Sequence, residues 1–107
     1  MGYELAAKRN AIPEGVELEN FLPSSVAWGD IIRMAEARGY LTKGKEEYYY
    51  ANDGHYVSKR LAARLHRLTK EYLAQEREEP WGTLYEKRVV DLLIWLEEAK
   101  NYGFFIV

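Results

Sequence analysis

A regular apolar stripe in the middle of the sequence limits what this chain can fold into. Its side chains recur at intervals of three and four residues and are Leu61, Leu65, Leu68 and Tyr72. This spacing places side chains on one face of an α-helix. Ser58 can cap a helix before the stripe, and Pro80 ends one after it. We therefore predict a long amphipathic helix from the Ser58 cap to about residue 79.

A second helix is predicted before it. Ser24 or Ser25 can accept a hydrogen bond from an early helical amide, and Gly39 follows as a stop, so the helix should run from about residue 25 to 38. Its apolar face consists of Trp28, Ile31, Ile32 and Ala35.

A third helix is predicted to begin at Thr83. Thr83 and Glu86 have the spacing of a capping box, in which each side chain satisfies a backbone amide of the first turn. Gly103 is a plausible left-handed stop at the other end. The main apolar stripe is formed by Tyr85, Val89, Leu92, Leu96 and Ala99.

Other apolar side chains lie off this stripe. Val90 and Ile94 fall on the opposite face of the third helix, and Trp95 falls to one side. A helix that is apolar on most sides is central in the fold or covered by a partner. A homodimer or a partner-binding groove at these three residues is one interpretation, and a core helix is the other.

Both ends of the chain carry short apolar segments. Tyr3, Leu5 and Ala7 alternate as in a strand, and residues 104–107 are four large apolar side chains that need to be docked. We expect the two end segments to pair, and a loop over residues 10–23. The predicted fold is α+β, a single domain over residues 1–107 with three helices and a small sheet involving the N- and C-terminal strands.

Composition excludes several classes of protein. The chain has 107 residues, no cysteine, 15 Lys plus Arg and 17 Asp plus Glu. It therefore has no disulfide, no thiolate nucleophile and no Cys-ligated metal. The most apolar stretch, residues 89–96, is interrupted by Asp91 and is far shorter than the ~20 residues that span a bilayer. No targeting segment is visible, so we expect a cytoplasmic protein that does not enter a membrane.

Few residues are suited to catalysis or metal binding. Asp53, His55 and Ser58 lie close in sequence, but a catalytic triad is defined by spatial geometry. A turn aspartate, an exposed histidine and a helix cap explain them better. Glu46 and Glu47 fit a solvated acidic loop, because no metal-binding or phosphate-binding motif surrounds them. We expect no enzymatic activity, no cofactor and no metal.

The predicted central helix carries a cluster of arginines. Arg60, Arg64 and Arg67 fall within one band beside the leucine stripe, and we call them the arginine ridge. The ridge could hold a phosphate backbone or pair with carboxylates of a protein. Alternatively, the arginine stems cover the rim of the core, which is the interpretation we favour. A formal net charge of −2 disfavours strong nucleic-acid binding.

Tyrosine is unusually frequent, and three tyrosines are consecutive at Tyr48, Tyr49 and Tyr50. Aromatic residues favour strands, so a short strand is predicted here, with Tyr49 opposite to its neighbours. Tyrosine is also common on recognition surfaces. Packing on the core and binding to a partner are equally good explanations.

The second half of the chain resembles small uncharacterised bacterial and phage proteins. In those proteins an Asn-rich turn precedes a capped helix and the chain closes on a Gly-Phe segment. Here the turn is at residues 52–54, the helix follows Val57 and Ser58, and the segment begins at Gly103. They often carry an early Trp-rich stretch, whereas this chain has Trp28 followed by Ile31. They have no assigned activity, so the resemblance implies a bacterial or phage origin and does not imply a function.

The function we expect is non-enzymatic protein binding. The tyrosines, the arginine ridge and the back of the third helix would meet the partner. In a phage or mobile element, a small inhibitor of a host defence system would fit, because such an inhibitor needs a surface and no active site. The alternative is a nucleic-acid-binding module that uses the basic face of the central helix.

Overall fold

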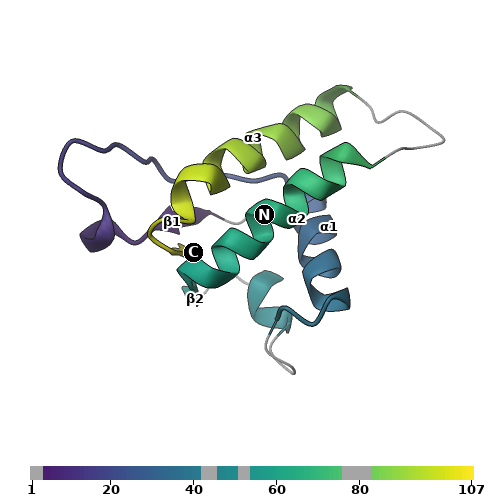
Figure 1. Ribbon diagram of the computed structural model, residues 1–107, viewed down its shortest axis with the longest axis horizontal. Helices are drawn as coiled ribbons and strands as arrows, with labels where there is room; N and C mark the ends of the chain where they lie inside the picture. Colours follow the sequence, from purple (N-terminus) through teal and green to yellow (C-terminus); the bar gives the residue numbers. More distant parts are fainter. Residues whose placement is uncertain (1–3, 42–45, 51–53, 76–82) are drawn as a thin grey trace.

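The computed structural model describes residues 4–41, 46–50, 54–75 and 83–107. Within these residues the fold is α+β, with three α-helices and a three-stranded antiparallel sheet that includes the strands from both chain ends (Figure 1). This confirms the fold class predicted from the sequence.

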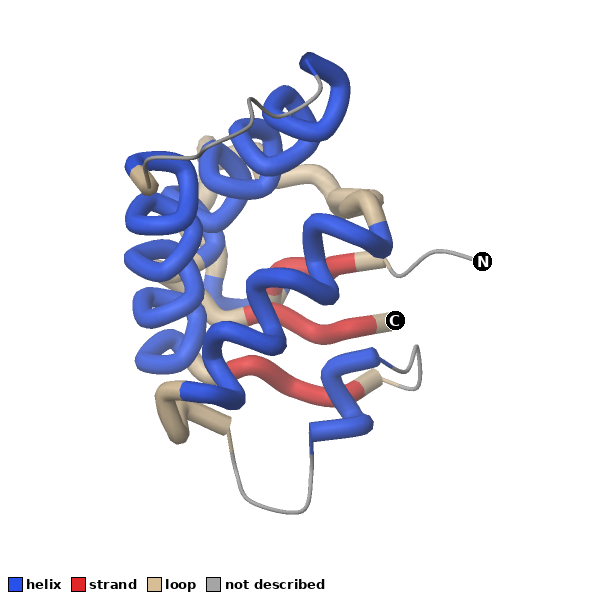
Figure 2. The backbone as a smooth tube through the Cα atoms, turned by 90° about the vertical axis from the view of Figure 1, so that its right-hand side faces the viewer, coloured by secondary structure: helices blue, strands red, loops and turns tan. Residues whose placement is uncertain are grey.

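The sheet joins the chain ends through its central strand. Strand β3 (Phe104–Ile106) lies between β1 (Leu5–Ala7) and β2 (His55–Val57). Leu5 of β1 is paired with Ile106 of β3, and Val57 of β2 is paired with Phe104 of β3. The predicted pairing of the chain ends is therefore confirmed, and the strands lie side by side in Figure 2.

The strand predicted just before residue 50 is wrong. Tyr48, Tyr49 and Tyr50 do not form a strand but belong to η2 (Glu46–Tyr50), a 3₁₀-helix. The strand lies instead at β2, just after the predicted turn. Asn52 and Asp53 of that turn lie outside the described residues, whereas Gly54 has the positive φ of +91° that favours glycine. Pairing with β3, about 50 residues away, selects β2 over the more aromatic segment.

The first two helices begin where the capping residues predict. Helix α1 (Ser25–Ala37) is capped by Ser24 and helix α2 (Lys59–Ala74) by Ser58, while helix α3 is described over Thr83–Ala99 and the residues before it lie outside the described range. Helix α2 ends at Ala74, earlier than the predicted residue 79. Gln75 already has extended backbone angles. The sequence that follows is rich in glutamate, which opposes the helix dipole at a carboxyl end.

Helix α1 crosses one face of the sheet, and α2 and α3 pack beside it (Figure 2). Trp28 of α1 and Trp95 of α3 both meet the ring of Phe104 edge-on, at centroid distances of 6.3 and 5.2 Å. The largest fully buried side chains come from all layers: Trp28, Phe104, Leu5, Ile31, Ile32, Leu65, Leu68, Leu92, Leu96 and Ile106. The predicted stripes of the three helices therefore form the core.

The first connecting loop is held against the fold. It starts with the 3₁₀-helix η1 (Arg9–Ala11). Leu5 and Phe21 exchange two backbone hydrogen bonds of 2.8 and 2.9 Å, which tie the end of the loop to β1. The ring of Phe21 stacks on Trp95 at 5.9 Å. The loop therefore covers one side of α3.

Candidate functional site

An open hollow lies where the first turns of α2 meet β2, η2 and the segment after α1. We call it the basic–aromatic hollow. Its volume is about 400 Å³, and its lining residues are Tyr40, Tyr49, His55, Tyr56, Ser58, Arg60, Leu61 and Arg64. None of these described lining residues is acidic. Two guanidinium groups and four rings therefore share one concave surface.

Helix capping sets the position of the arginines. The hydroxyl of Ser58 accepts a hydrogen bond of 3.2 Å from the amide of Leu61, which starts α2 next to the hollow. Arg60 and Arg64 are one helical turn apart and project on the same side. The guanidinium carbon of Arg64 lies 4.9 Å from the centroid of the Tyr40 ring, a cation–π contact. The guanidinium of Arg64 thus covers a partly buried ring.

One wall of the hollow is formed by strand β2, a strand that was not predicted from the sequence. Its His55 is half-buried and not exposed, because the ring of Tyr48 stacks on it at 5.5 Å and the ring of Tyr49 meets it edge-on at 4.8 Å. Tyr56 is exposed, and the ammonium of Lys8 lies 5.5 Å from its ring centroid. The sequence signal for this strand is the adjacent pair of strand-favouring residues, Tyr56 and Val57, directly after the predicted turn.

The three consecutive tyrosines have different surroundings. Tyr49 is 4% exposed, and its carbonyl oxygen accepts a hydrogen bond of 2.6 Å from the indole N–H of Trp28. Tyr50 is half-buried against the core. Tyr48 is 37% exposed and flanks the hollow through His55. Of the three, Tyr48 presents the most surface to a partner, and Tyr49 lines the hollow.

Charge around the hollow is unbalanced. Among the described residues, no carboxylate forms an ion pair with Arg60, Arg64 or Arg67, and Arg60 and Arg67 are exposed. The basic surface ends one turn after Arg67, where Glu71 pairs with Arg38 at 2.5 Å. The hydrogen bond that the guanidinium of Arg38 donates to this carboxylate raises the pKa of Arg38. The arginine ridge is therefore a short basic surface, and two of its three residues, Arg60 and Arg64, line the hollow.

The predicted residues of α3 lie on a separate surface. Ile94 is 65% exposed and Val90 is half-buried. Trp95 is only 8% exposed, because Phe21 covers its ring and its indole N–H donates to the carbonyl of Glu19 at 2.8 Å. Trp95 therefore has little surface left for a partner. None of the described side chains of α3 lines the hollow.

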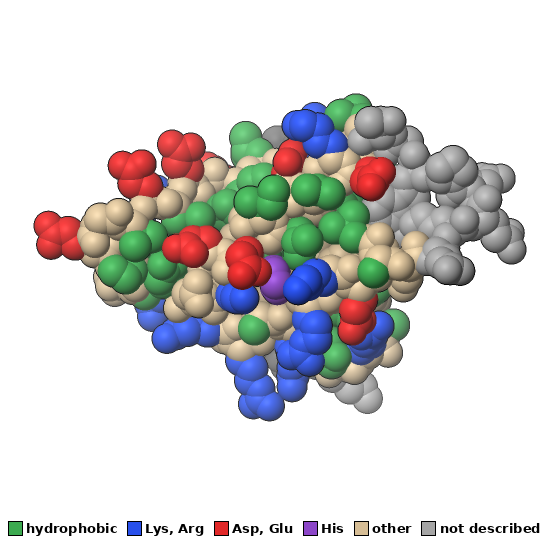
Figure 3. Space-filling model, turned by 45° about the horizontal axis from the view of Figure 1, so that its top comes forward, with side chains coloured by type: hydrophobic (Ala, Val, Ile, Leu, Met, Phe, Trp, Pro, Cys, Tyr) green, Lys and Arg blue, Asp and Glu red, His purple; other side chains and the backbone are tan. Residues whose placement is uncertain are grey.

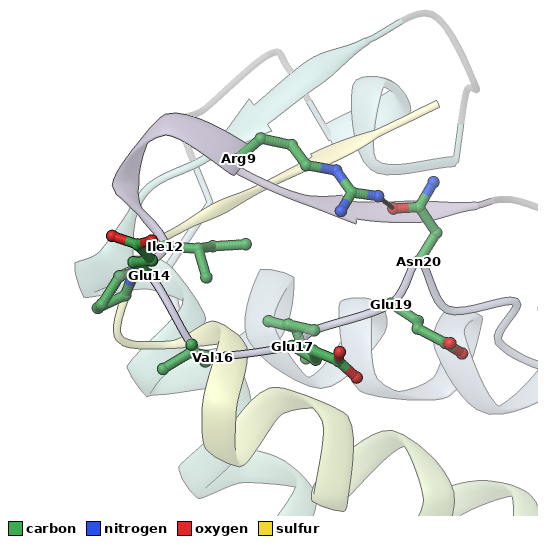
Figure 4. A pocket seen from close by; sticks show the side chains of 10 residues that line it. Arg9, Ile12, Glu14, Val16, Glu17, Glu19 and Asn20 are labelled. Atoms are coloured by element: carbon green, nitrogen blue, oxygen red, sulfur yellow. Dashed lines mark hydrogen bonds between the residues drawn. The ribbon is translucent and has the colours of Figure 1, made fainter.

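Another hollow is formed by the loop itself. It has a volume of about 660 Å³ and is lined by Arg9 and residues 12–20 (Figure 4). The guanidinium of Arg9 donates to the side-chain oxygen of Asn20 at 3.3 Å, and the amide of Asn20 donates to Glu4 at 3.1 Å. Its polar groups thus close the loop, and within the described part of the chain no functional groups from other elements line it.

Chemically, the basic–aromatic hollow is suited to holding an anion. Guanidinium groups are permanent donors, and aromatic rings offer apolar contact next to them. Ser58 acts as a helix cap, and Asp53 lies outside the described residues, so the described groups form no triad. In the described part of the chain, no three potential metal ligands come together.

Comparison with known proteins gives no match for this chain among family models, curated proteins or solved structures. None of the helices formed by the described residues has the length and apolar character needed to cross a membrane.

Proposed function

We propose that the protein acts without catalysis, by binding an acidic segment of a protein partner in the basic–aromatic hollow. One observation carries the proposal: Arg60 and Arg64, which have no ion-pair partner among the described residues, converge with aromatic rings on one open concave surface. Arginine pairs with a carboxylate through two parallel hydrogen bonds. Arginine and tyrosine also contribute most strongly to protein interfaces.

The extent of the basic surface favours a protein over a nucleic acid. A nucleic-acid interface needs a long basic face that follows several phosphates. Here the ridge spans about two turns of α2 before Glu71 and Arg38 neutralise each other. The hollow, of about 400 Å³, accommodates one or two side chains. An acidic side chain flanked by apolar ones matches its guanidinium groups and its rings.

The biological setting that we propose is inhibition. A phage or mobile-element protein that blocks a host defence system acts stoichiometrically, and a surface of this kind is enough for that task. This setting rests on the proposed binding mode and adds no catalytic requirement.

Site-specific crosslinking tests the proposal directly. A photoreactive phenylalanine derivative in place of Arg67 would lie about one turn of α2 from Arg64, which lines the hollow. Crosslinked material from cells that contain the natural partner would be split into nuclease-treated and protease-treated halves. We expect a protein adduct that survives nuclease, and an acidic crosslinked segment.

The matched variants decide whether the hollow is responsible. Arg60→Ala with Arg64→Ala should reduce the adduct at least tenfold, whereas Lys87→Ala with Arg88→Ala, which removes two charges from α3, should leave it unchanged. An adduct that nuclease removes would favour the nucleic-acid alternative and overturn the proposal. So would a protein adduct that the paired hollow variant leaves intact.

A further inference from the structure

A second depression lies on α3, away from the basic–aromatic hollow. It runs between the helix and the loop that covers it, and we call it the acidic groove. Its volume is about 380 Å³, and its lining residues are Glu17, Leu18, Phe21, Asp91, Ile94, Trp95 and Glu98. Four are apolar and three are acidic, and no described lining residue is basic. It shares no residue with the hollow.

The floor of the acidic groove is apolar and fixed. The rings of Phe21 and Trp95 stack within 5.9 Å at an interplanar angle of 19°. The indole N–H of Trp95 already donates to the carbonyl of Glu19, so the floor needs no further hydrogen-bond partner. Ile94 rises beside it with 65% of its surface exposed. Exposed aliphatic surface next to a rigid aromatic floor favours burial by an apolar side chain.

The rim of the groove is acidic. Asp91 and Glu98 are seven residues apart on α3, which is about 10 Å along the helix axis. Glu17 stands opposite them on the loop. Lys87 reaches Asp91 at 3.6 Å, and the hydroxyl of Tyr102 donates to Glu98 at 3.1 Å. The carboxylates of Glu17 and Glu98 therefore form no ion pair with any described residue.

Charge and spacing select one kind of occupant. We infer that the acidic groove binds a basic amphipathic helix of a partner protein. Its aliphatic side chains would cover the floor, and its Lys or Arg side chains would lie over Glu17, Asp91 and Glu98. The separation of Asp91 and Glu98 matches basic residues two turns apart on such a helix. In Figure 3, hydrophobic side chains on this side of the molecule lie among acidic ones, and most Lys and Arg side chains gather along the lower edge.

A second copy of the chain fits this groove less well. Its basic surface is the exposed face of α2, and the exposed residues there are Lys59, Arg60, Arg67, Lys70, Glu71 and Ala74. This face offers no aliphatic side chain larger than alanine to cover the floor. The occupant must carry both large apolar and basic side chains on one helix. The described exposed surface of α2 carries basic side chains but no large apolar ones.

The experiment uses a defined probe. A fluorescent 18-residue peptide of leucine and lysine, patterned as an amphipathic helix, would be titrated with the full chain and followed by anisotropy. A scrambled peptide of the same composition and a leucine–glutamate helix are the controls. We expect the basic helix to bind at least tenfold more tightly than either control peptide.

Variants then locate the binding. Glu17→Gln with Asp91→Asn should weaken the basic helix at least tenfold, and Ile94→Ser should weaken it several-fold. Glu36→Gln with Glu86→Gln, which removes two exposed carboxylates elsewhere, should not. Arg60→Ala with Arg64→Ala should also have no effect, so failure here is distinct from failure of the proposed function.

Two outcomes would overturn the inference. One is a basic helix that binds no better than its scrambled control, or binds equally to the groove variants. The other is a dimer in sedimentation velocity that Ile94→Ser abolishes while the peptide still fails to bind, because a second copy would then be the occupant.

Discussion

The two ends of α2 use polar and aromatic side chains in opposite ways. At the first turns, Arg60 and Arg64 face an open hollow and form no ion pair within the described residues. Near the last turn, the hydroxyl of Tyr72 contacts that of Tyr85 at 3.0 Å and donates to Asp30 at 3.3 Å. We call this second cluster the helix junction, because it joins all three helices.

Polar groups in the helix junction satisfy one another. Tyr85 also donates to Asp30, whose other carboxylate oxygen pairs with Arg33. Burial, together with the hydrogen bond to Asp30, raises the pKa of Tyr85 well above its ordinary value, so its hydroxyl stays protonated and keeps donating. The hollow and the helix junction contain similar residue types, so residue type alone does not distinguish a binding surface from a structural cluster. What separates them is whether the partners of the polar groups lie inside the fold.

Gly103 gives the largest predicted effect, because the wall of the hollow is packed on it. Its φ is +82°, and an added Cβ would overlap the Tyr56 hydroxyl and lie 3.0 Å from the Val57 carbonyl oxygen. Gly103→Ala should lower the free energy of unfolding by about 3 kcal/mol through backbone strain and overpacking. The measurement is urea denaturation.

The control for this prediction is another left-handed glycine. Gly39 has a φ of +71° and no atom within 4 Å of an added Cβ, so Gly39→Ala should cost only about 1 kcal/mol. Equal losses for the two variants would mean that the wall of the hollow is not tightly packed against Gly103.

The helix junction gives the next effect. Asp30→Ala removes the acceptor shared by Tyr72 and Tyr85, and should lower the free energy of unfolding by about 2 kcal/mol. Arg60→Ala with Arg64→Ala should cost less than about 1 kcal/mol, because only the cation–π contact of Arg64 is lost. Denaturant unfolding with an unchanged m-value would establish both. A hollow variant as destabilising as Asp30→Ala would break the comparison.

His66, in the middle of α2, gives the smallest effect. Burial lowers the pKa of His66 below its ordinary value of 6.5, and the ion pair with Glu97 only partly offsets this. Below pH 6.5 the unfolded chain therefore binds a proton that the folded chain does not yet bind. The free energy of unfolding should fall as the pH drops from 6.5 towards the lower pKa of the folded state.

Comparing wild type with His66→Gln over a pH series of urea unfolding isolates this contribution. The variant should lose part of the decline between neutral and mildly acidic pH. Identical pH profiles would mean that the α2–α3 contact does not disfavour the charged imidazole.

Much of the fold follows from the sequence alone. The stripes of the helices, the caps at Ser24 and Ser58 and the stops at Gly39 and Gly103 depend on residues within a few positions of each other. Strand β2 was missed because its partner β3 lies about 50 residues away. Helix α2 ends before the residue that Pro80 predicts, because the glutamates after Ala74 oppose the helix dipole at its carboxyl end.

The candidate site was less predictable. The arginine ridge was visible from spacing, but Tyr40, His55 and Tyr56 meet it only when α1, β2 and α2 pack together. Trp95 was expected at a partner-binding surface, yet residues 19–21 cover it from more than 70 positions away. No local pattern encodes a contact over such a distance.

The amino-acid sequence by itself determined which segments become helices and which faces they bury, because periodicity and capping act over a few residues. The tertiary structure alone decided which tyrosines, arginines and carboxylates have partners inside the molecule. Those partners come from distant elements, and only packing of the helices on the sheet brings them within hydrogen-bonding distance.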